Sequence, residues 1–361
     1  MVGKEKIVWD LDYHRRIPYS SDPAYPIHRW YLINESQSIL QSQEIFRELG
    51  IAPGDLVIDP FMGSGTIALQ CTLVGADFIG YDILAACVVG SRAKLVARYV
   101  LPKALTSFLR QTQVVCREVD TAVEEFWRLQ GLIMQVCLGP EIWVLAACLY
   151  SSMHAKGTSA TALALRQEFA RNVADAVYDI SHFSFQTGTK ELQRVVWGSG
   201  IDTDWQAETK RDYRRAFLIT SPPFPKTSQN HSEVWKICES AAERMLYEKD
   251  ESPVGRMEEM PFFSCERYLE LTRSALQRLR AFDAEVVAVL ECEYPVAEGD
   301  PDGNLDFRVS RMAEQLGFEC RELRITHYVE SPGVICQHKT AIRGSLIYLN
   351  CNIETDIKPF R

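Results

Sequence analysis

The chain has 361 residues, of which 47% are hydrophobic and 24% charged, and its formal net charge is −9. This composition is that of an ordinary globular protein, and no apolar run approaches the roughly 18 residues that a membrane-spanning helix needs. The acidic balance argues against a broad nucleic-acid-binding surface but leaves room for a narrow basic cleft. Because the first residues form no apolar secretory segment, we expect a cytoplasmic protein without membrane association.

The cysteines are numerous but lack the spacing of ligands or of a disulfide framework. There are 11 of them, and no two form a Cys-x-x-Cys pair. Cys336 and His338 lie too close together, with no second pair nearby, for an ordinary zinc site. We therefore expect buried small side chains in a reducing compartment, with neither disulfides nor a bound metal.

The first part of the chain alternates between helix and strand patterns. Residues 1–50 are expected to form an irregular lead and then a helix from about Ser36 to Leu49, which Pro53 and Gly54 terminate. Short apolar runs then alternate with segments of helical character, an order typical of a parallel sheet covered on both faces. The predicted strands are Asp55–Asp59 and Asp77–Asp82, and the predicted helices are Thr66–Val74 and Ile83–Tyr99.

The pattern becomes helical throughout from Pro102 to about Thr189, with apolar residues three or four positions apart. Acidic and basic residues are nearly balanced in this segment. We interpret residues 101–189 as a helical insertion into one domain that spans residues 1–361. The α/β core of that domain would comprise residues 51–100 and 190–361.

Strand patterns resume after the helical segment. Gln193–Trp197 and Ala216–Thr220 are predicted buried strands separated by a polar loop, and a further strand is expected at Glu285–Leu290. The last two strands would pair as an antiparallel hairpin at the sheet edge. They lie near Glu319–Tyr328 and Ser345–Asn350, and the predicted helices of this half are Ser232–Tyr247, Cys265–Leu279 and Phe307–Leu316, the last ended by Gly317.

A glycine-rich motif directly follows the first predicted core strand and precedes a helix. Glycine permits positive φ and close approach of a ligand to the backbone, and such a loop delivers a ligand to the carboxyl edge of an open sheet. A lone Gly-x-Gly is more often a structural turn, and this motif has neither a third glycine nor a P-loop lysine. The candidate binding residues are Asp59, Pro60, Phe61, Gly63, Ser64, Gly65 and Thr66.

Asp82 closes the next predicted strand, about twenty residues beyond the glycines, where ribose-binding carboxylates lie in such folds. The same position suits a helix N-cap. A second motif, Thr220-Ser221-Pro222-Pro223-Phe224, ends a later strand. Two prolines must stop a strand, so a rigid terminus is the plain structural explanation of this motif.

Together the two motifs carry a family resemblance. The octet Asp59–Thr66 resembles the DPF-x-GSGT motif, and Ser221–Phe224 resembles the SPPY/F motif, of site-specific DNA amino-methyltransferases that modify cytosine N4 or adenine N6. The resemblance implies a Rossmann-like, S-adenosylmethionine-dependent methyltransferase fold: a mostly parallel α/β sheet with an antiparallel terminal hairpin, plus the helical insertion. It also implies S-adenosylmethionine as the cofactor, with Ile83 and Ser199 added to the binding residues. The loop 198–202 lies where that family contacts the adenine of the cofactor, and residues 28–31 and Ser36 lie where it contacts the methionine moiety.

The resemblance assigns catalytic roles to Ser221, Pro222, Pro223 and Phe224. The Ser221 hydroxyl and the Pro222 carbonyl would accept both N–H bonds of the target amine and localise its lone pair, while Phe224 stacks on a base flipped out of double-stranded DNA. Serine before the prolines favours cytosine N4. The alternatives are adenine N6, an RNA base amine, a small amine-bearing metabolite, or a non-catalytic nucleic-acid-binding subunit.

Partners other than DNA are also implied by the resemblance, namely a cognate restriction endonuclease or a specificity subunit. The family often carries a basic target-recognition region, and this chain shows none. Its densest basic cluster either contacts phosphates or is a solvated loop face. The cluster consists of Lys210, Arg211, Arg214 and Arg215, with Lys226 beyond.

Overall fold

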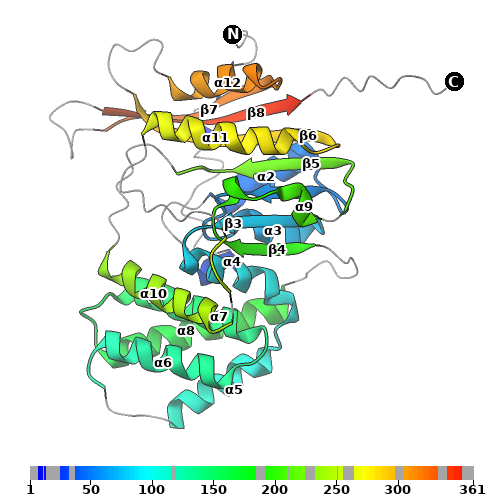
Figure 1. Cartoon of the computed structure of the whole chain (residues 1–361). Coiled ribbons are helices and arrows are strands. Elements are labelled where there is room, and N and C mark those ends of the chain that lie inside the picture. The colour runs from blue at the N-terminus through cyan, green and yellow to red at the C-terminus, as the bar shows by residue number, and fades with distance from the viewer. Residues whose placement is uncertain are drawn as a thin grey trace.

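The computed structural model describes residues 7–10, 12–13, 25–31, 37–114, 119–183, 192–209, 211–223, 232–249, 251–254, 264–296, 304–331 and 340–351. Within these residues the core is one eight-stranded sheet in the order β1-β7-β8-β6-β5-β2-β3-β4 (Figure 1). In that order the strands are Ile7–Trp9, Glu319–Ser331, Thr340–Cys351, Glu285–Val296, Arg215–Thr220, Leu56–Asp59, Asp77–Asp82 and Gln193–Trp197.

Strand β8 is antiparallel to both of its neighbours, β6 and β7, and every other pairing in the described sheet is parallel. The predicted mostly parallel α/β sheet with an antiparallel C-terminal hairpin is therefore confirmed. The hairpin does not form the edge, however. The short strand β1, which lies in the expected irregular lead, pairs with β7 and covers its outer side.

Alternate side chains of the strands enter two cores. Val57, Phe78 and Phe217 face the core shared with the helices α2 (Ile39–Leu49), α3 (Thr66–Val74) and α4 (Ala85–Val96). Leu56, Ile58 and Leu218 face the opposite core, as the two-residue period of a strand requires. That second core includes residues of α9 (Trp205–Thr209), α11 (Cys265–Arg280) and α12 (Leu305–Gln315).

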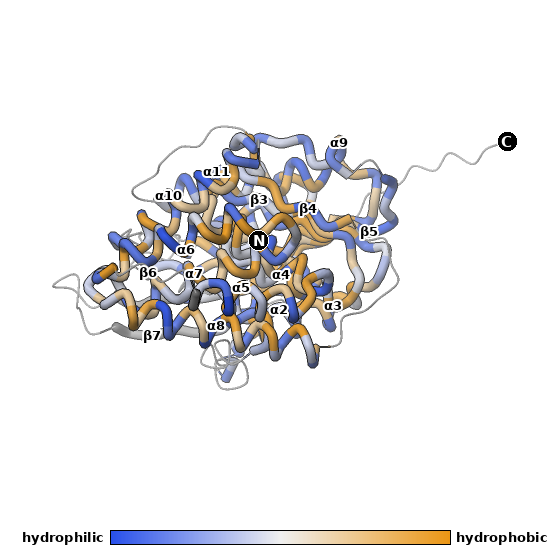
Figure 2. Tube along the Cα trace, turned by 90° about the horizontal axis from the view of Figure 1, so that it is seen from below, coloured by the Kyte–Doolittle hydropathy of each residue, from blue (hydrophilic) through white to orange (hydrophobic). Residues whose placement is uncertain are grey.

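Helices α5 (Pro102–Val114), α6 (Ala122–Val136), α7 (Glu141–Lys156) and α8 (Ala162–His182) occupy the predicted insertion. They gather at the β4 end of the sheet with α10 (Glu233–Tyr247), as Figure 1 shows. Seen from that end, each of these helices carries both apolar and polar residues (Figure 2). Their apolar faces continue the core that contains α3 and α4. None of the helices in the described ranges is long and apolar enough to cross a membrane.

Candidate active site

The strand register brings the predicted site residues to one edge of the sheet. Asp59, the last residue of β2, pairs with Gly80 of β3, and Asp82, the last residue of β3, pairs with Trp197 of β4. On its other side β2 pairs with β5, whose last residue is Thr220. The chain leaves β2 for a neighbour on one side and later returns to its other side, so the carboxyl ends of β2 and β5 mark a switch point, where open α/β sheets bind ligands.

The glycine-rich loop after β2 adopts the conformations that its glycines allow. Gly63 and Gly65 have φ of 51° and 80°. A Cβ on Gly65 would lie 2.8 Å from the Cα of Ser91 in α4, so its missing side chain admits the α4 backbone. We expected this space to serve a ligand. At position 65 this space serves close packing between α3 and α4, and the ligand contact expected of Gly65 stays a prediction.

Asp59 is buried and connects the two sequence motifs. Its Oδ1 accepts a 2.6 Å hydrogen bond from Thr220 Oγ1 and a 3.2 Å bond from the Phe61 amide. Burial raises the pKa of Asp59 to about 7, an effect that both hydrogen bonds oppose and the charge of Asp82 reinforces. Asp59 therefore holds a proton more readily than an exposed carboxyl, and the two loops beside it are joined through one oxygen atom.

Asp82 joins the glycine-rich loop to the start of α4. Its Oδ2 accepts the Gly63 amide at 2.9 Å, and its Oδ1 accepts the Leu84 amide at 2.9 Å. Desolvation raises its pKa to about 6, while the two amides act in the opposite direction. Each carboxylate oxygen has two lone pairs. Each oxygen of Asp82 can therefore accept one more donor, such as one hydroxyl of a ribose diol.

Glu239 of α10 takes the capping position that Asp82 was considered for. Its two carboxylate oxygens accept the Ala85 and Ala86 amides of α4 at 2.6 and 2.9 Å. Desolvation raises the pKa of Glu239 to about 7. Sequence reasoning missed this residue, because nothing local connects it to a helix that begins more than 150 residues earlier.

The other predicted cofactor residues surround these carboxylates. Thr66 Oγ1 donates to the Gln37 carbonyl at 2.9 Å, and the Ile83 carbonyl accepts from Trp197 Nε1 at 3.1 Å. The Ser199 amide donates to the Val254 carbonyl at 2.8 Å, which brings the segment after α10 beside the end of β4. Pro60 and Ser64 are buried, and Phe61 is partly exposed.

The second motif follows β5 at the same edge. Ser221 and Pro223 are partly exposed and Pro222 is buried. Phe224 lies outside the described residues, as does Ser36. Among the residues that the structure does describe, the Ser221 hydroxyl has no hydrogen-bond partner, whereas Thr220 beside it is committed to Asp59. Among the described side chains of the motif, the Ser221 hydroxyl is therefore the group that remains free to form a hydrogen bond.

The segment expected near the methionine moiety contacts the helical insertion, and its place beside that moiety stays a prediction. Arg29 and Trp30 both donate to the carboxylate of Asp179 in α8. Trp30 and Tyr31 are buried. His28 of this segment connects toward the glycine-rich loop through Lys94.

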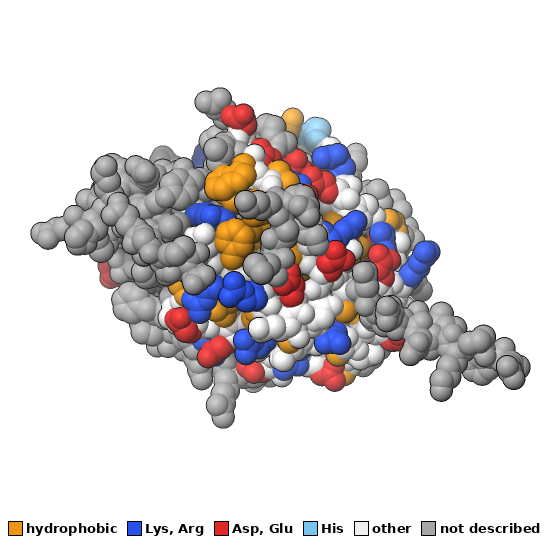
Figure 3. Space-filling view, turned by 90° about the horizontal axis from the view of Figure 1, so that it is seen from above, with side chains coloured by type: hydrophobic (Ala, Val, Ile, Leu, Met, Phe, Trp, Pro, Cys, Tyr) orange, Lys and Arg blue, Asp and Glu red, His pale blue; other side chains and the backbone are white. Residues whose placement is uncertain are grey.

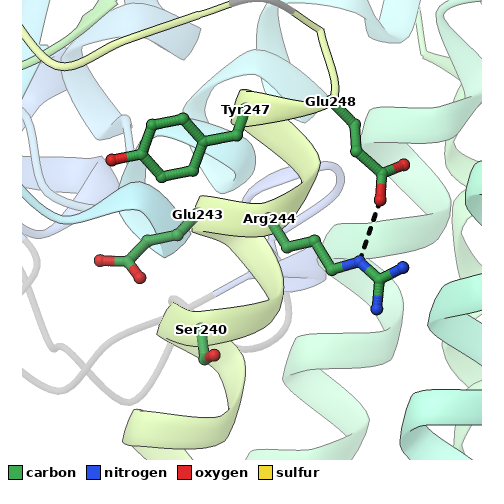
Figure 4. A pocket seen from close by; sticks show the side chains of 5 residues that line it. All are labelled: Ser240, Glu243, Arg244, Tyr247 and Glu248. Carbon is green, nitrogen blue, oxygen red and sulfur yellow. Dashed lines mark hydrogen bonds and ion pairs between the residues drawn. The ribbon is translucent and has the colours of Figure 1, made fainter.

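A shallow hollow lies on the outer face of α10 (Figure 4). Arg244 and Glu248 form a 2.9 Å ion pair there, and Tyr247 packs edge-on against Trp197 with 5.1 Å between ring centroids. Among the described residues, one helix alone lines this hollow, and Ser221, Pro222 and Pro223 do not line it. Its lining residues are Ser240, Glu243, Arg244, Tyr247 and Glu248.

The described arginines of the basic cluster lie at the amino ends of the strands, opposite the carboxyl ends that carry the motifs. Arg215, the first residue of β5, pairs with Asp55 just before β2, and Arg211 pairs with Asp77, the first residue of β3. These arginines therefore join strand beginnings, far from the strand ends that carry the motifs. Lys210 and Lys226 lie outside the described residues. On the face shown in Figure 3, acidic and basic side chains are interspersed.

Known proteins resemble the part of the chain that contains the glycine-rich loop. Residues 45–88 match the family described as DNA methylase, a stretch that includes the glycine-rich loop and Asp82. The expected resemblance to DNA amino-methyltransferases is thereby confirmed.

Two curated relatives match short stretches of the chain. The type II methyltransferase M.BsoBI of Geobacillus stearothermophilus is 37% identical over 68 residues, which are 19% of this chain and 13% of that protein. The type II methyltransferase M.MjaII of Methanocaldococcus jannaschii is 35% identical over 85 residues, 22% of this chain and 15% of that protein. The chain thus aligns with 13–15% of the length of these relatives.

Two solved structures are similar over most of the chain. TrmN from Thermus thermophilus has 15% identity and a TM-score of 0.35, with 93% of this chain and 52% of that chain covered. The magnesium protoporphyrin IX methyltransferase from Synechocystis PCC 6803, solved with bound S-adenosylmethionine, has 9% identity and a TM-score of 0.29, with 93% and 96% covered.

Proposed function

We propose that this chain methylates an exocyclic amino group of a base in double-stranded DNA, with cytosine N4 as the acceptor and S-adenosylmethionine as the methyl donor. The observation that carries the proposal is the 2.6 Å hydrogen bond from Thr220 to Asp59, because it joins the glycine-rich motif and the Ser-Pro-Pro motif at the ends of adjacent strands. The family match over residues 45–88 supports the same chemistry.

The residues at the strand ends suit this cofactor. Asp82 retains acceptor capacity for a ribose diol, and its negative charge in the ionised form favours a cationic ligand. We assign the cofactor contacts to Asp59, Gly63, Asp82, Ile83 and Ser199. Bound S-adenosylmethionine supplies an electrophilic methyl group on a sulfonium sulfur.

The Ser-Pro-Pro motif would prepare the acceptor. An exocyclic amine is a weak nucleophile because its lone pair is delocalised into the ring. If Ser221 Oγ and the Pro222 carbonyl accept hydrogen bonds from the two N–H groups of the amine, the lone pair would be directed toward the methyl group. Phe224 would stack on the base once it has left the duplex, which chemistry on a base requires. After methyl transfer the amine proton is released to solvent, because a serine hydroxyl is too weak a base to keep it.

The test is transfer of labelled methyl groups to duplex DNA, total RNA and free nucleosides in parallel. We expect label in duplex DNA, and nucleoside analysis after digestion should identify N4-methylcytosine. Detection of N6-methyladenine instead would show that adenine is the target base, and the chain would still be a DNA amino-methyltransferase. Label confined to RNA or to free nucleosides would contradict the DNA substrate. No transfer to any acceptor, by protein purified from the native host together with its bound partners, would contradict the enzyme.

A partner would explain how an acidic chain holds DNA. Because the chain aligns with a small part of its type II relatives, we propose a specificity subunit or a cognate restriction endonuclease as that partner. Purification from the native host should then recover it with the chain. Full activity and sequence selectivity of the isolated chain would argue against the need for one.

A further inference from the structure

Asp179 of α8 is the point at which the helical insertion holds the N-terminal segment. Its buried carboxylate accepts the Ile27 amide at 2.8 Å, Trp30 Nε1 at 2.9 Å and Arg29 Nε at 3.1 Å. Arg29 Nη2 donates to the second oxygen at 2.5 Å. A buried carboxylate needs such donors because isolated burial of its charge is costly. The turn 27–30 is thus folded around one side chain of the insertion.

The turn is held in a conformation that its own sequence disfavours. Ile27 has φ of 66°, and among the described non-glycine residues it is alone in having positive φ. A β-branched residue is a true outlier there, and such a conformation persists only where the surroundings enforce it. The bond from the Ile27 amide to Asp179 is one of the contacts that enforce it. Loss of Asp179 would therefore release the turn, not merely weaken it.

When the turn 27–30 is held by Asp179, it positions a buried lysine, Lys94. His28 is fully buried, and its Nδ1 lies 3.3 Å from Nζ of Lys94, a fully buried residue of α4. Lys94 Nζ donates to the Ser64 carbonyl at 2.5 Å. One turn earlier in α4, Ser91 Oγ donates to the Gly63 carbonyl at 3.2 Å. Two consecutive carbonyls of the glycine-rich loop are thereby held by α4.

We propose that Asp179 and Lys94 are positioning residues for the glycine-rich loop. Asp179 fixes the turn 27–30, the turn fixes His28 against Lys94, and Lys94 fixes the loop conformation that presents the Gly63 amide to Asp82. The helical insertion then supports cofactor binding, a role that its sequence left open. The proposal rests on the proposed function for the identity of the cofactor, but the support of the loop is independent of it.

The experiment compares Asp179→Asn with a matched control, Glu125→Gln. Glu125 is a fully buried carboxylate of the same insertion and pairs with Arg128 and Arg166. Within the part of the chain that the structure describes, it forms no hydrogen bond or ion pair with the turn 27–30. Both variants should lower the melting temperature. Only Asp179→Asn should raise the Kd for S-adenosylmethionine by calorimetry, by tenfold or more, with kcat at saturating cofactor within about threefold of wild type.

Amide hydrogen exchange over residues 62–66 of the ligand-free protein separates this proposal from the proposed function. Exchange should accelerate in Asp179→Asn and in Lys94→Met, and stay at the wild-type rate in Glu125→Gln. If Asp179→Asn does not fold, Lys94→Met carries the same expectations. Wild-type protein that fails to bind S-adenosylmethionine would contradict the proposed function alone. Unchanged exchange in the folded variants, or equal effects in the control, would overturn the support of the loop by the insertion.

Discussion

The hydroxyl of Thr220 donates to the carboxylate of Asp59 across two neighbouring strands, with 2.6 Å between Oγ1 and Oδ1. Asp59 begins the glycine-rich motif, and Thr220 directly precedes the Ser-Pro-Pro motif. Both residues are buried, so the bond is shielded from competing water. A methyl transfer requires donor and acceptor at a fixed separation, and this bond ties together the two loops that would hold them.

Thr220→Val keeps the shape of the side chain and removes the hydrogen bond. We expect a loss of about 1–3 kcal/mol in the free energy of unfolding, since the buried Asp59 loses a donor. We also expect at least a tenfold fall in kcat/KM for methyl transfer. Thr72→Val is the matched control, because Thr72 is buried in α3 and, among the described residues, its hydroxyl bonds only to the Ala68 carbonyl of its own helix. Equal kinetics in the two variants would show that the bond has no part in activity.

Asp59 should make stability depend on pH. Burial raises its pKa to about 7 in the folded chain, above the ordinary value of 3.8. A raised carboxyl pKa contributes stability that is fully present below about pH 4 and is lost as the pH rises to about 7. The contribution lost is at most about 4 kcal/mol, from a shift of about three units.

Urea unfolding of wild type and Asp59→Asn at pH 5, 6, 7 and 8 measures this contribution. The stability of wild type relative to the variant should fall between pH 5 and 7 and then level off. Two curves that stay parallel would show that the carboxyl of Asp59 titrates normally.

The affinity for S-adenosylmethionine should fall as Asp82 becomes protonated. The pKa of Asp82 is raised to about 6 by desolvation, and a carboxylate accepts hydroxyl donors better than a carboxylic acid. A cationic ligand favours the ionised form, so the Kd should rise as the pH falls below about 6, by up to about tenfold per pH unit. Calorimetry on Asp82→Asn should show weaker binding at every pH. It should also lack the rise in Kd below about pH 6. An identical pH profile in wild type and variant would exclude Asp82 as its origin.

The strands of the site were predictable because their signals are local. The bounds predicted for Asp77–Asp82 and Gln193–Trp197 agree with the structure, since buried parallel strands are short apolar runs between polar loops. Parallel strand ends share an edge, so motifs that follow β2, β3 and β5 had to meet. The antiparallel hairpin was also predictable, but the strand β1 that pairs with its outer side was not. Strand β1 has three residues and therefore no periodicity to detect.

The supports of the site were not predictable, because they depend on pairs distant in sequence. Glu239 caps α4, and Asp179 holds the turn at Ile27, at sequence separations of 154 and 152 positions. A carboxylate on an amphipathic helix gives no sign of which distant amide it will meet. The same limit applies to Gly65, since the sequence shows a missing side chain but not that Ser91 fills the space.

Ser221 and Ser199 should affect different steps. Ser221→Ala removes an acceptor for the target amine, so we expect kcat to fall by about 10–100-fold with the Kd for S-adenosylmethionine within about twofold of wild type. Ser199→Ala, on the cofactor side, should raise that Kd and leave kcat at saturating cofactor nearly unchanged. Stopped-flow single-turnover rates and calorimetry separate the two. Wild-type single-turnover rates in Ser221→Ala would make the Ser-Pro-Pro motif structural.

Arg215, at the amino end of β5, should stabilise the fold without contacting DNA. Arg215 donates through Nε to Asp55 Oδ1 at 2.9 Å and through Nη2 to the second oxygen of Asp55. This pair joins the amino ends of β5 and β2, opposite the edge that carries Ser221. Arg215→Ala should therefore lower the free energy of unfolding by about 1 kcal/mol and leave the salt dependence of DNA binding unchanged.

Asp55→Asn is the matched control, because it breaks the same ion pair and keeps the positive charge of Arg215. If the pair is structural, both variants lose stability, and log Kd against log salt has the wild-type slope in both. If Arg215 contacts a phosphate, Arg215→Ala alone flattens the slope, by about 0.9 for one contact with duplex DNA. That second result would move the DNA to the amino edge of the sheet. It would also separate the DNA from the Ser-Pro-Pro motif by the full length of the strands, which base methylation by this motif cannot accommodate.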